Sequence, residues 1–231
     1  MKKICFLLAF LSIFLIGESA SAAPLKSVVT KKIHKITPTL ELNIEYPQIG
    51  NAEIDKNIGD YVGQTIKDFG PGEKSEHWTS VLYIRYKISQ YKDKTVSVRF
   101  YNYQFTGGAH GSEVVNFRTY DLKTGKRLSY GDIFKPDFEY LTTLWRNAEP
   151  QVIVAYKQRG WANDAYSWDW VREGAGPKTD NYRNFYLTDN GLVIYFGQYQ
   201  VAPYAAGTVE VPIKYEKLSG GLSDYFKSLQ K

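Results

Sequence analysis

Two segments of the chain bring together residue types that could do chemistry. The first is a glycine-dense turn at residues 106–111, in which Gly107, Gly108 and Gly111 surround His110. Glycine permits a left-handed backbone and the close approach of neighbouring groups, so such a turn can present a histidine rigidly. His110 then suits a ligand contact or proton transfer. The alternative, which we favour, is a structural corner between two strands in which His110 is hydrogen-bonded in place.

The second segment, residues 160–181, sets aromatic rings among carboxylates, and we expect it to be irregular. Its candidate ligand-binding residues are Trp161, Asp164, Tyr166, Trp168, Asp169 and Trp170. Aromatic faces can stack on sugar rings while carboxylates bind hydroxyl groups, and Trp and Tyr are also favoured anchors for protein partners. Asp164, Asp169 and Glu173 could instead supply an acid–base pair for glycoside hydrolysis. A third interpretation is an ordered loop whose tryptophans cover the core.

Other catalytic and metal-binding patterns are missing from the sequence. The three histidines, His34, His77 and His110, lie far apart and have no second histidine or carboxylate at a metal-ligand spacing. The chain has no Gly-x-Ser-x-Gly motif, and no helix is expected after the glycine turn to complete a phosphate-binding loop. We therefore predict no metal, no cofactor and no catalytic residue, and we favour a protein that is not an enzyme.

The first 22 residues have the pattern of a secretory signal peptide. Two lysines precede an apolar run at residues 5–16, and small residues follow at 20–22. The apolar run is too short to span a bilayer comfortably. We expect cleavage between Ala22 and Ala23 and export to the periplasm or the extracellular space.

Composition narrows the class of partner. Cys5 is the only cysteine and lies in the segment to be removed, so the mature chain is expected to have no disulfide bond. The whole chain carries a net charge of +5, dispersed along the sequence. That charge favours anionic wall polymers over nucleic acid. No second apolar segment is long enough to act as a membrane anchor in the mature form.

Hydrophobic periodicity predicts an α+β protein. Alternation indicates strands at residues 39–46, 80–91, 95–105, 113–122 and 208–215 and a hairpin at 183–196, while helical spacing indicates helices at 51–69, from 137 onward and at 223–229. Pro150 predicts a kink or a new start in the second helix. We expect a mostly antiparallel sheet with segregated helices, in two small, intimately packed subdomains. Their predicted bounds are 23–118 and 119–217, with a short terminal helix within 218–231.

Several stretches resemble an extracytoplasmic domain pair of undefined function. They are Tyr-Gln-Phe-Thr-Gly-Gly-Ala-His-Gly at 103–111, Tyr-Asp-Leu-Lys-Thr-Gly-Lys at 120–126, Gly-Asp-Ile-Phe at 131–134, Asn-Phe-Tyr-Leu-Thr-Asp-Asn-Gly-Leu at 184–192 and Tyr-Gln-Val-Ala-Pro-Tyr-Ala-Ala-Gly at 199–207. This pair forms the outer part of RsiV-type anti-sigma factors, which bind lysozyme, and it precedes the catalytic domain of some peptidoglycan deacetylases. The resemblance covers residues 40–215. It implies that the second predicted subdomain, residues 119–217, is an RsiV-like C-terminal domain.

The resemblance implies an α+β fold and a binding role near peptidoglycan. We recognise neither an anti-sigma segment nor a deacetylase domain in the chain, so neither activity is carried over. The first hypothesis is therefore a non-catalytic, secreted or periplasmic binding protein of the cell envelope. Its ligand would be a wall glycan or a wall-cleaving enzyme such as lysozyme. The alternatives are a hydrolase acting on peptidoglycan or related wall material, and a structural accessory protein.

Overall fold

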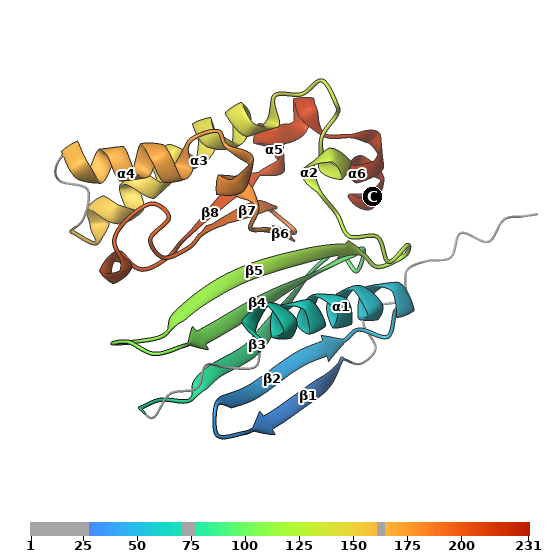
Figure 1. The fold of residues 1–231 in the computed structure, drawn as a ribbon. Coiled ribbons are helices and arrows are strands. Elements are labelled where there is room, and N and C mark those ends of the chain that lie inside the picture. The colour runs from blue at the N-terminus through green and yellow to red at the C-terminus, as the bar shows by residue number, and fades with distance from the viewer. Residues whose placement is uncertain (1–27, 71–76, 161–164) are drawn as a thin grey trace, which may run out of the picture.

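The computed structural model describes residues 28–70, 77–160 and 165–231, which form two packed layers (Figure 1). The predicted signal peptide, residues 1–22, lies outside the described residues. Each layer has its own sheet, one of five strands and one of three. Within the described residues, no helix is long and apolar enough to cross a membrane. The α+β class predicted from the sequence is confirmed.

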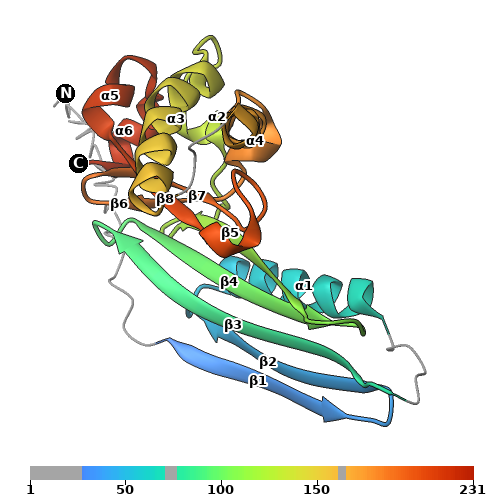
Figure 2. The ribbon, with the colours of Figure 1, turned by 90° about the vertical axis from the view of Figure 1, so that its left-hand side faces the viewer.

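The first layer is a five-stranded sheet in the order β1-β2-β3-β4-β5. Its strands are β1 (Val29–Ile36), β2 (Leu40–Gln48), β3 (Ser80–Tyr91), β4 (Thr95–Phe105) and β5 (Ser112–Asp121). All neighbours pair antiparallel except β2 and β3, which are parallel and are connected through helix α1 (Ala52–Phe69). Figure 2 shows β1 at the edge of this sheet that lies farthest from the second layer.

Helix α1 forms because its capping and its apolar spacing agree. The Asn51 side chain accepts hydrogen bonds from the backbone N–H groups of Glu53, at 3.1 Å, and Ile54, at 3.3 Å. Such a cap satisfies donors that have no partner within the helix. Ile54, Ile58 and Val62 then fall on one face and are buried against the five-stranded sheet.

The second layer combines a three-stranded antiparallel sheet with most of the helices. The strands are β6 (Phe185–Thr188), β7 (Gly191–Phe196) and β8 (Val209–Lys214). The helical segments are α2 (Tyr130–Ile133), α3 (Tyr140–Gln158), α4 (Ala165–Ala175), η1 (Thr179–Tyr182), η2 (Tyr204–Ala206), α5 (Tyr215–Leu218), η3 (Ser219–Gly221) and α6 (Asp224–Leu229). One continuous core joins them.

Three sequence predictions differ from the observed elements. Strand β1 was not predicted, because it is an exposed edge strand rich in lysine and lacks apolar alternation. Helix α3 runs through Pro150 without a new start, since buried residues on both sides, Ala148 and Val152 among them, hold it against the core. Residues 165–175 form helix α4, where an irregular segment was expected; Val171 and Ala175, four residues apart, are buried on its inner side.

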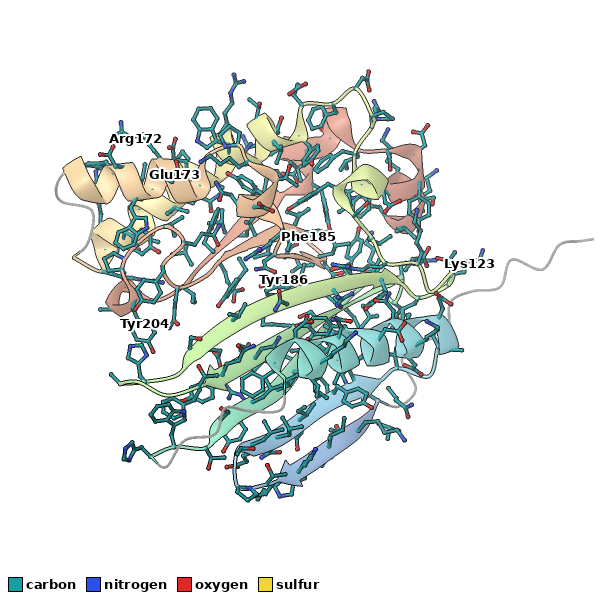
Figure 3. All side chains as sticks on the ribbon, viewed as in Figure 1. Lys123, Arg172, Glu173, Phe185, Tyr186 and Tyr204 are labelled. Carbon is teal, nitrogen blue, oxygen red and sulfur yellow. The ribbon has the colours of Figure 1, made fainter. Side chains whose placement is uncertain are left out.

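The centre of the contact between the layers is Arg99 on β4. Its guanidinium carbon lies 4.6 Å from the ring centroid of Phe117, 5.2 Å from that of Tyr186 and 5.4 Å from that of Tyr195. It also forms an ion pair with Glu210 of β8 at 2.8 Å. Figure 3 shows Tyr186 between the two layers.

Electrostatics at this contact favour the charged pair. Burial alone would raise the pKa of Glu210, but hydrogen bonds from Arg99 and Tyr186 outweigh it and hold that pKa below its usual value. The Tyr186 hydroxyl donates to Glu210 at 2.5 Å. Burial, followed by this hydrogen bond, raises the pKa of Tyr186 to about 12.

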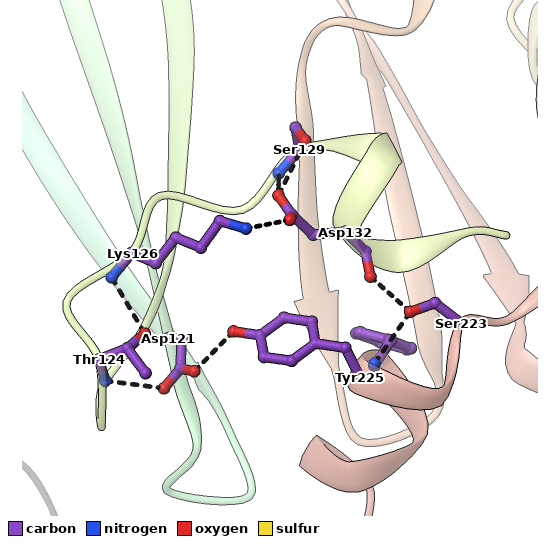
Figure 4. A network of polar contacts seen from close by, with 8 residues as sticks. Asp121, Thr124, Lys126, Ser129, Asp132, Ser223 and Tyr225 are labelled. Carbon is purple, nitrogen blue, oxygen red and sulfur yellow. Dashed lines mark hydrogen bonds and ion pairs between the residues drawn. The ribbon is translucent and has the colours of Figure 1, made fainter. Parts of the chain in front are cut away.

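A second polar network connects the end of β5 to α6 (Figure 4). The buried Asp121 carboxylate accepts a hydrogen bond from the Tyr225 hydroxyl at 2.6 Å and from the backbone N–H of Lys123 at 2.7 Å. Asp132 accepts from Lys126, while its backbone carbonyl accepts from the Ser223 hydroxyl at 2.6 Å. The two layers are therefore held together both at Arg99 and at this network, and the Asn184 side chain adds hydrogen bonds to the backbone of Phe117 and Val115 on β5.

Candidate functional site

Exposed aromatic rings form a row at one end of the molecule. The ring centroids of His110 and Tyr204 lie 5.9 Å apart in a stacked arrangement, and those of Tyr204 and Tyr199 lie 5.6 Å apart. Tyr199 is 56% exposed and Tyr204 is 48% exposed. We call His110, Tyr204 and Tyr199 the aromatic row. It brings the turn between β4 and β5 together with the loop that precedes β8.

Tyr199 is held in an unusual backbone conformation. Its φ of 63° lies in the left-handed region, which is rarely occupied by residues other than glycine. The indole Nε1 of Trp170 donates a hydrogen bond to the Tyr199 carbonyl at 3.2 Å. The Gln200 side chain donates to the carbonyls of Gly174, at 3.1 Å, and Asn181, at 2.9 Å. These contacts fix the residue 197–200 loop against α4 and η1, so the exposed ring is preorganised.

Gly174 permits this close approach. A Cβ atom at that position would lie 1.7 Å from the backbone carbonyl oxygen of Gln200, which is far inside van der Waals contact. The glycine turn at residues 106–111 contains a similar constraint. Gly107 has a φ of 104°, and a Cβ there would lie 2.6 Å from the indole ring of Trp78.

A polar cleft of about 390 Å³ continues from the aromatic row. Tyr199 belongs to both, and Tyr195 lies in the wall of the cleft. The polar side chains of the lining come from both layers and include Glu113, Asp180, Asn181, Arg183, Asn184, Gln198, Gln200 and Thr208. Amides, carboxylates and a guanidinium together offer many hydrogen-bond donors and acceptors. The combination of exposed rings and a polar cleft suits a ligand with apolar faces and many hydroxyl or amide groups.

A second, smaller cavity of about 280 Å³ lies beside the cleft. Arg183 lines both cavities, and Arg127 lines only the second. The apolar part of the lining consists of Leu128, Tyr130 and Phe185, all of which are buried.

The role of His110 stays a prediction. The residue lies in the glycine turn between β4 and β5 and is exposed. Its ring Nδ1 lies 2.8 Å from the carbonyl oxygen of Gly111, which it can reach as a donor. Its ring stacks on Tyr204, and no contact with a carboxylate is observed within the described residues. The residue is hydrogen-bonded but available to a ligand.

The structure places the ligand-binding candidates predicted between residues 160 and 181 in different environments. Trp161 and Asp164 lie outside the described residues, and Tyr166 belongs to α4. Trp168 is half-buried, with the Lys157 ammonium 5.2 Å from its ring centroid. Asp169 is exposed and forms an ion pair with Arg172. The role of these residues in ligand binding stays a prediction.

Trp170 supports the aromatic row from behind. It is half-buried and contacts the backbone of Tyr199, as described above. The residues that sequence reasoning missed are Tyr199, Tyr204 and Arg183. The first two lie within Tyr-Gln-Val-Ala-Pro-Tyr-Ala-Ala-Gly at residues 199–207, a stretch that carries the family resemblance but whose sequence does not indicate which rings are exposed. In the described part of the chain, no three histidines, cysteines or carboxylates group together as metal ligands.

Comparisons with known proteins match each layer to a different family model. Residues 33–113 match the model described as deacetylase PdaC, and residues 131–216 match the model described as a protein of unknown function (DUF3298). The chain is 30% identical over 194 residues to the peptidoglycan-N-acetylmuramic acid deacetylase PdaC of Bacillus subtilis. This alignment covers 81% of the chain but only 40% of PdaC. The predicted similarity to a peptidoglycan deacetylase is confirmed.

Two further similarities extend over most of both proteins compared. The immunogenic protein MPT64 of Mycobacterium tuberculosis H37Rv is 22% identical over 186 residues, which cover 78% of this chain and 77% of MPT64. The crystal structure of a DUF3298 family protein from Pseudomonas aeruginosa PAO1 superposes with a TM-score of 0.67 at 20% identity. That superposition covers 89% of this chain and 97% of the other, and it shows a shared fold.

Proposed function

We propose that this protein is an exported, non-catalytic binding protein of the cell envelope that holds glycan strands of peptidoglycan. The observation that carries the proposal is the continuity of the aromatic row with the polar cleft through Tyr199. Sugars present apolar C–H faces that stack on rings, and N-acetyl sugars add amides and hydroxyls that need polar partners. Tyr199 and Tyr204 offer the rings, and Gln198 offers a side-chain amide. The Asn184 amide is already hydrogen-bonded at both ends to the backbone of β5, and the Asn181 amide nitrogen donates to the carbonyls of Glu173 and Gly176, so these two side chains shape the cleft.

The rigidity of the site supports binding. The Tyr199 loop is fixed to α4 by Trp170 and Gln200, so little conformational freedom is lost when a ligand stacks on the ring. The relation to PdaC supports the choice of wall material, since the name of that protein places its activity on peptidoglycan. The net charge of +5 suits an anionic wall.

Hydrolysis is the second candidate, because two carboxylates, Glu113 and Asp180, line the cleft. Glu113 forms an ion pair with Arg85 at 2.8 Å, so one of its carboxylate oxygens is already engaged. A glycosidase of the usual kind needs one carboxylic acid that keeps its proton. A test with intact wall material therefore includes muropeptide release, with Glu113→Gln and Asp180→Asn as variants.

The proposal is tested by sedimentation of the purified protein with peptidoglycan sacculi. We expect Tyr199→Ala and Tyr204→Ala each to weaken binding by about 1–3 kcal/mol, the range measured for aromatic stacking on planar ligands. Val154→Ala is the matched control, because Val154 is 51% exposed and lies on α3 away from the cleft. Normal binding by both tyrosine variants would refute the site. If the wild-type protein binds lysozyme and not sacculi, and both tyrosine variants lose that binding, the ligand of the site is a protein and not a glycan.

A further inference from the structure

The second cavity combines unpaired positive charge with an apolar floor. Arg127 and Arg183 line it and are exposed, and the ion pairs among the described residues include neither of them. Partial burial, together with the positive charge of nearby Arg118, lowers the pKa of Arg127, as expected where cations are gathered without a neutralising anion. A guanidinium binds planar carboxylates through two parallel hydrogen bonds. The cavity therefore favours an anionic group.

The floor restricts the kind of anion. Leu128, Tyr130 and Phe185 are each less than a tenth exposed and form the apolar part of the lining. The Tyr130 hydroxyl already donates to the carbonyl of Tyr182 at 2.7 Å, so that tyrosine presents ring surface to the cavity. An apolar floor beneath two guanidiniums suits a carboxylate that carries small aliphatic groups, such as the methyl groups of alanine. A fully hydrated phosphate would leave that floor unused.

Arg183 connects this cavity to the cleft, because it lines both. A ligand that fills both cavities needs a polar sugar part on one side of Arg183 and an acidic, partly apolar arm on the other. Muramic acid residues have this form, since a lactyl group joins the sugar to a short peptide that ends in a carboxylate.

We propose that the second cavity binds the carboxylate-bearing stem peptide of a muramyl unit whose sugars occupy the cleft. This inference rests on the proposed function and narrows it, from wall glycan in general to glycan that still carries its peptides. An unsubstituted N-acetylglucosamine polymer would then fill the cleft alone and bind more weakly.

Isothermal titration of the mature protein with three soluble ligands tests the inference. The ligands are a disaccharide–tetrapeptide muropeptide, the same disaccharide without its peptide and with its lactyl carboxyl group amidated, and chitotetraose. We expect the muropeptide to bind roughly tenfold more tightly than the peptide-free disaccharide, the factor that one charge-assisted hydrogen bond supplies. Arg127→Gln should abolish this difference and leave chitotetraose affinity unchanged, because Arg127 lines only the second cavity.

Two further variants sharpen the result. Arg183→Gln should weaken binding of all three ligands, since its side chain lines both cavities, whereas Arg146→Gln, an exposed arginine that lines neither, should change none. Equal affinity for the muropeptide and the peptide-free disaccharide in the wild type would overturn the inference while leaving glycan binding intact. An Arg127-dependent gain with a peptide-free teichoic acid fragment would overturn it in favour of phosphate. If none of the three ligands binds to the wild-type protein, the proposed function itself is refuted.

Discussion

Replacing Arg99 with methionine should loosen the contact between the two layers. Methionine keeps an apolar stem but removes the ion pair with Glu210 and the charge that lies over Phe117, Tyr186 and Tyr195. Breaking a fully buried pair costs about 3–5 kcal/mol, because one charge is left without a partner. The Arg99 side chain is 18% exposed and that of Glu210 is 37% exposed, so solvent screening reduces this cost.

We expect a loss of about 2–3 kcal/mol in the free energy of unfolding once the cation–π contacts are included. For a chain of this length that corresponds to a fall of roughly 4–12 °C in Tm. Urea denaturation at neutral pH, followed by tyrosine fluorescence and far-ultraviolet circular dichroism, measures the change. Glu210→Gln and the double variant complete a mutant cycle that isolates the coupling between the two side chains.

Arg85→Met is the matched control for this experiment. Arg85 also forms an ion pair at 2.8 Å and also lies over a tyrosine ring, but its side chain is 67% exposed. Exposed pairs contribute about 0–1 kcal/mol. If Arg99→Met unfolds within about 0.5 kcal/mol of wild type, or no differently from Arg85→Met, the reasoning about the buried contact is wrong.

Three shorter predictions follow from other parts of the structure. The pKa values of Glu210 and Asp132 are both lowered, because hydrogen bonds to their charged forms outweigh burial. The stability that these two carboxylates contribute is therefore complete above their unfolded-state pKa values of about 4 and is lost as the pH falls through their folded-state pKa values. Urea midpoints measured from pH 7 to pH 3 should decline only in the acid range. Gly174→Ala should destabilise the protein by about 1–3 kcal/mol in chemical denaturation, because its Cβ would meet a backbone carbonyl. The control Gly59→Ala, in the open interior of α1, should stabilise the protein by about 0.5–1 kcal/mol. A Gly174→Ala variant as stable as the wild type would contradict the close packing. The exported protein should begin at Ala23 when its N-terminus is sequenced, and residues 1–22 still attached would refute the predicted cleavage.

Elements with strong periodicity could be predicted from the sequence almost residue by residue. Strands β3 and β4 have the predicted bounds, since apolar residues alternate along both and a short turn separates them. Lys92 and Asp93 adopt positive φ in that turn, as a tight hairpin requires. Asn51 caps α1 at the start of the predicted helix. In each case local propensity and tertiary packing favour the same structure.

The remaining elements depend on packing that the local pattern does not contain. Strand β1 pairs with β2 through backbone hydrogen bonds while its side chains stay exposed, so it leaves no apolar signature. Helix α3 continues through Pro150 because its neighbours in the core outweigh a local cost of about 3 kcal/mol. The parallel pairing of β2 with β3 follows from the α1 crossover, which was predicted as a helix but not as a connection.

The candidate site was recognised only in part, because it is assembled from distant segments. His110 lies on the turn before β5, Asp180 and Arg183 lie at or beside η1, and Tyr199 and Tyr204 precede β8. No spacing rule connects these positions in a single sequence. The tryptophan-rich segment at residues 161–170 is the stronger signal in the sequence, and within it Trp170 donates a hydrogen bond to the Tyr199 carbonyl.

Chemical-shift mapping tests the central claim, that the aromatic row and the cleft bind wall glycan, most directly. A soluble disaccharide–tetrapeptide muropeptide is titrated into ¹⁵N-labelled mature protein, and backbone amide shifts are followed to saturation. We predict that the largest shifts fall at residues 107–115, 179–185 and 197–208, which surround the aromatic row and the cleft. The stem peptide should add shifts at residues 127–130 of the second cavity, and α1 and β1 should stay unperturbed. Saturable shifts confined to α1 or β1, or none at millimolar ligand, would contradict the account.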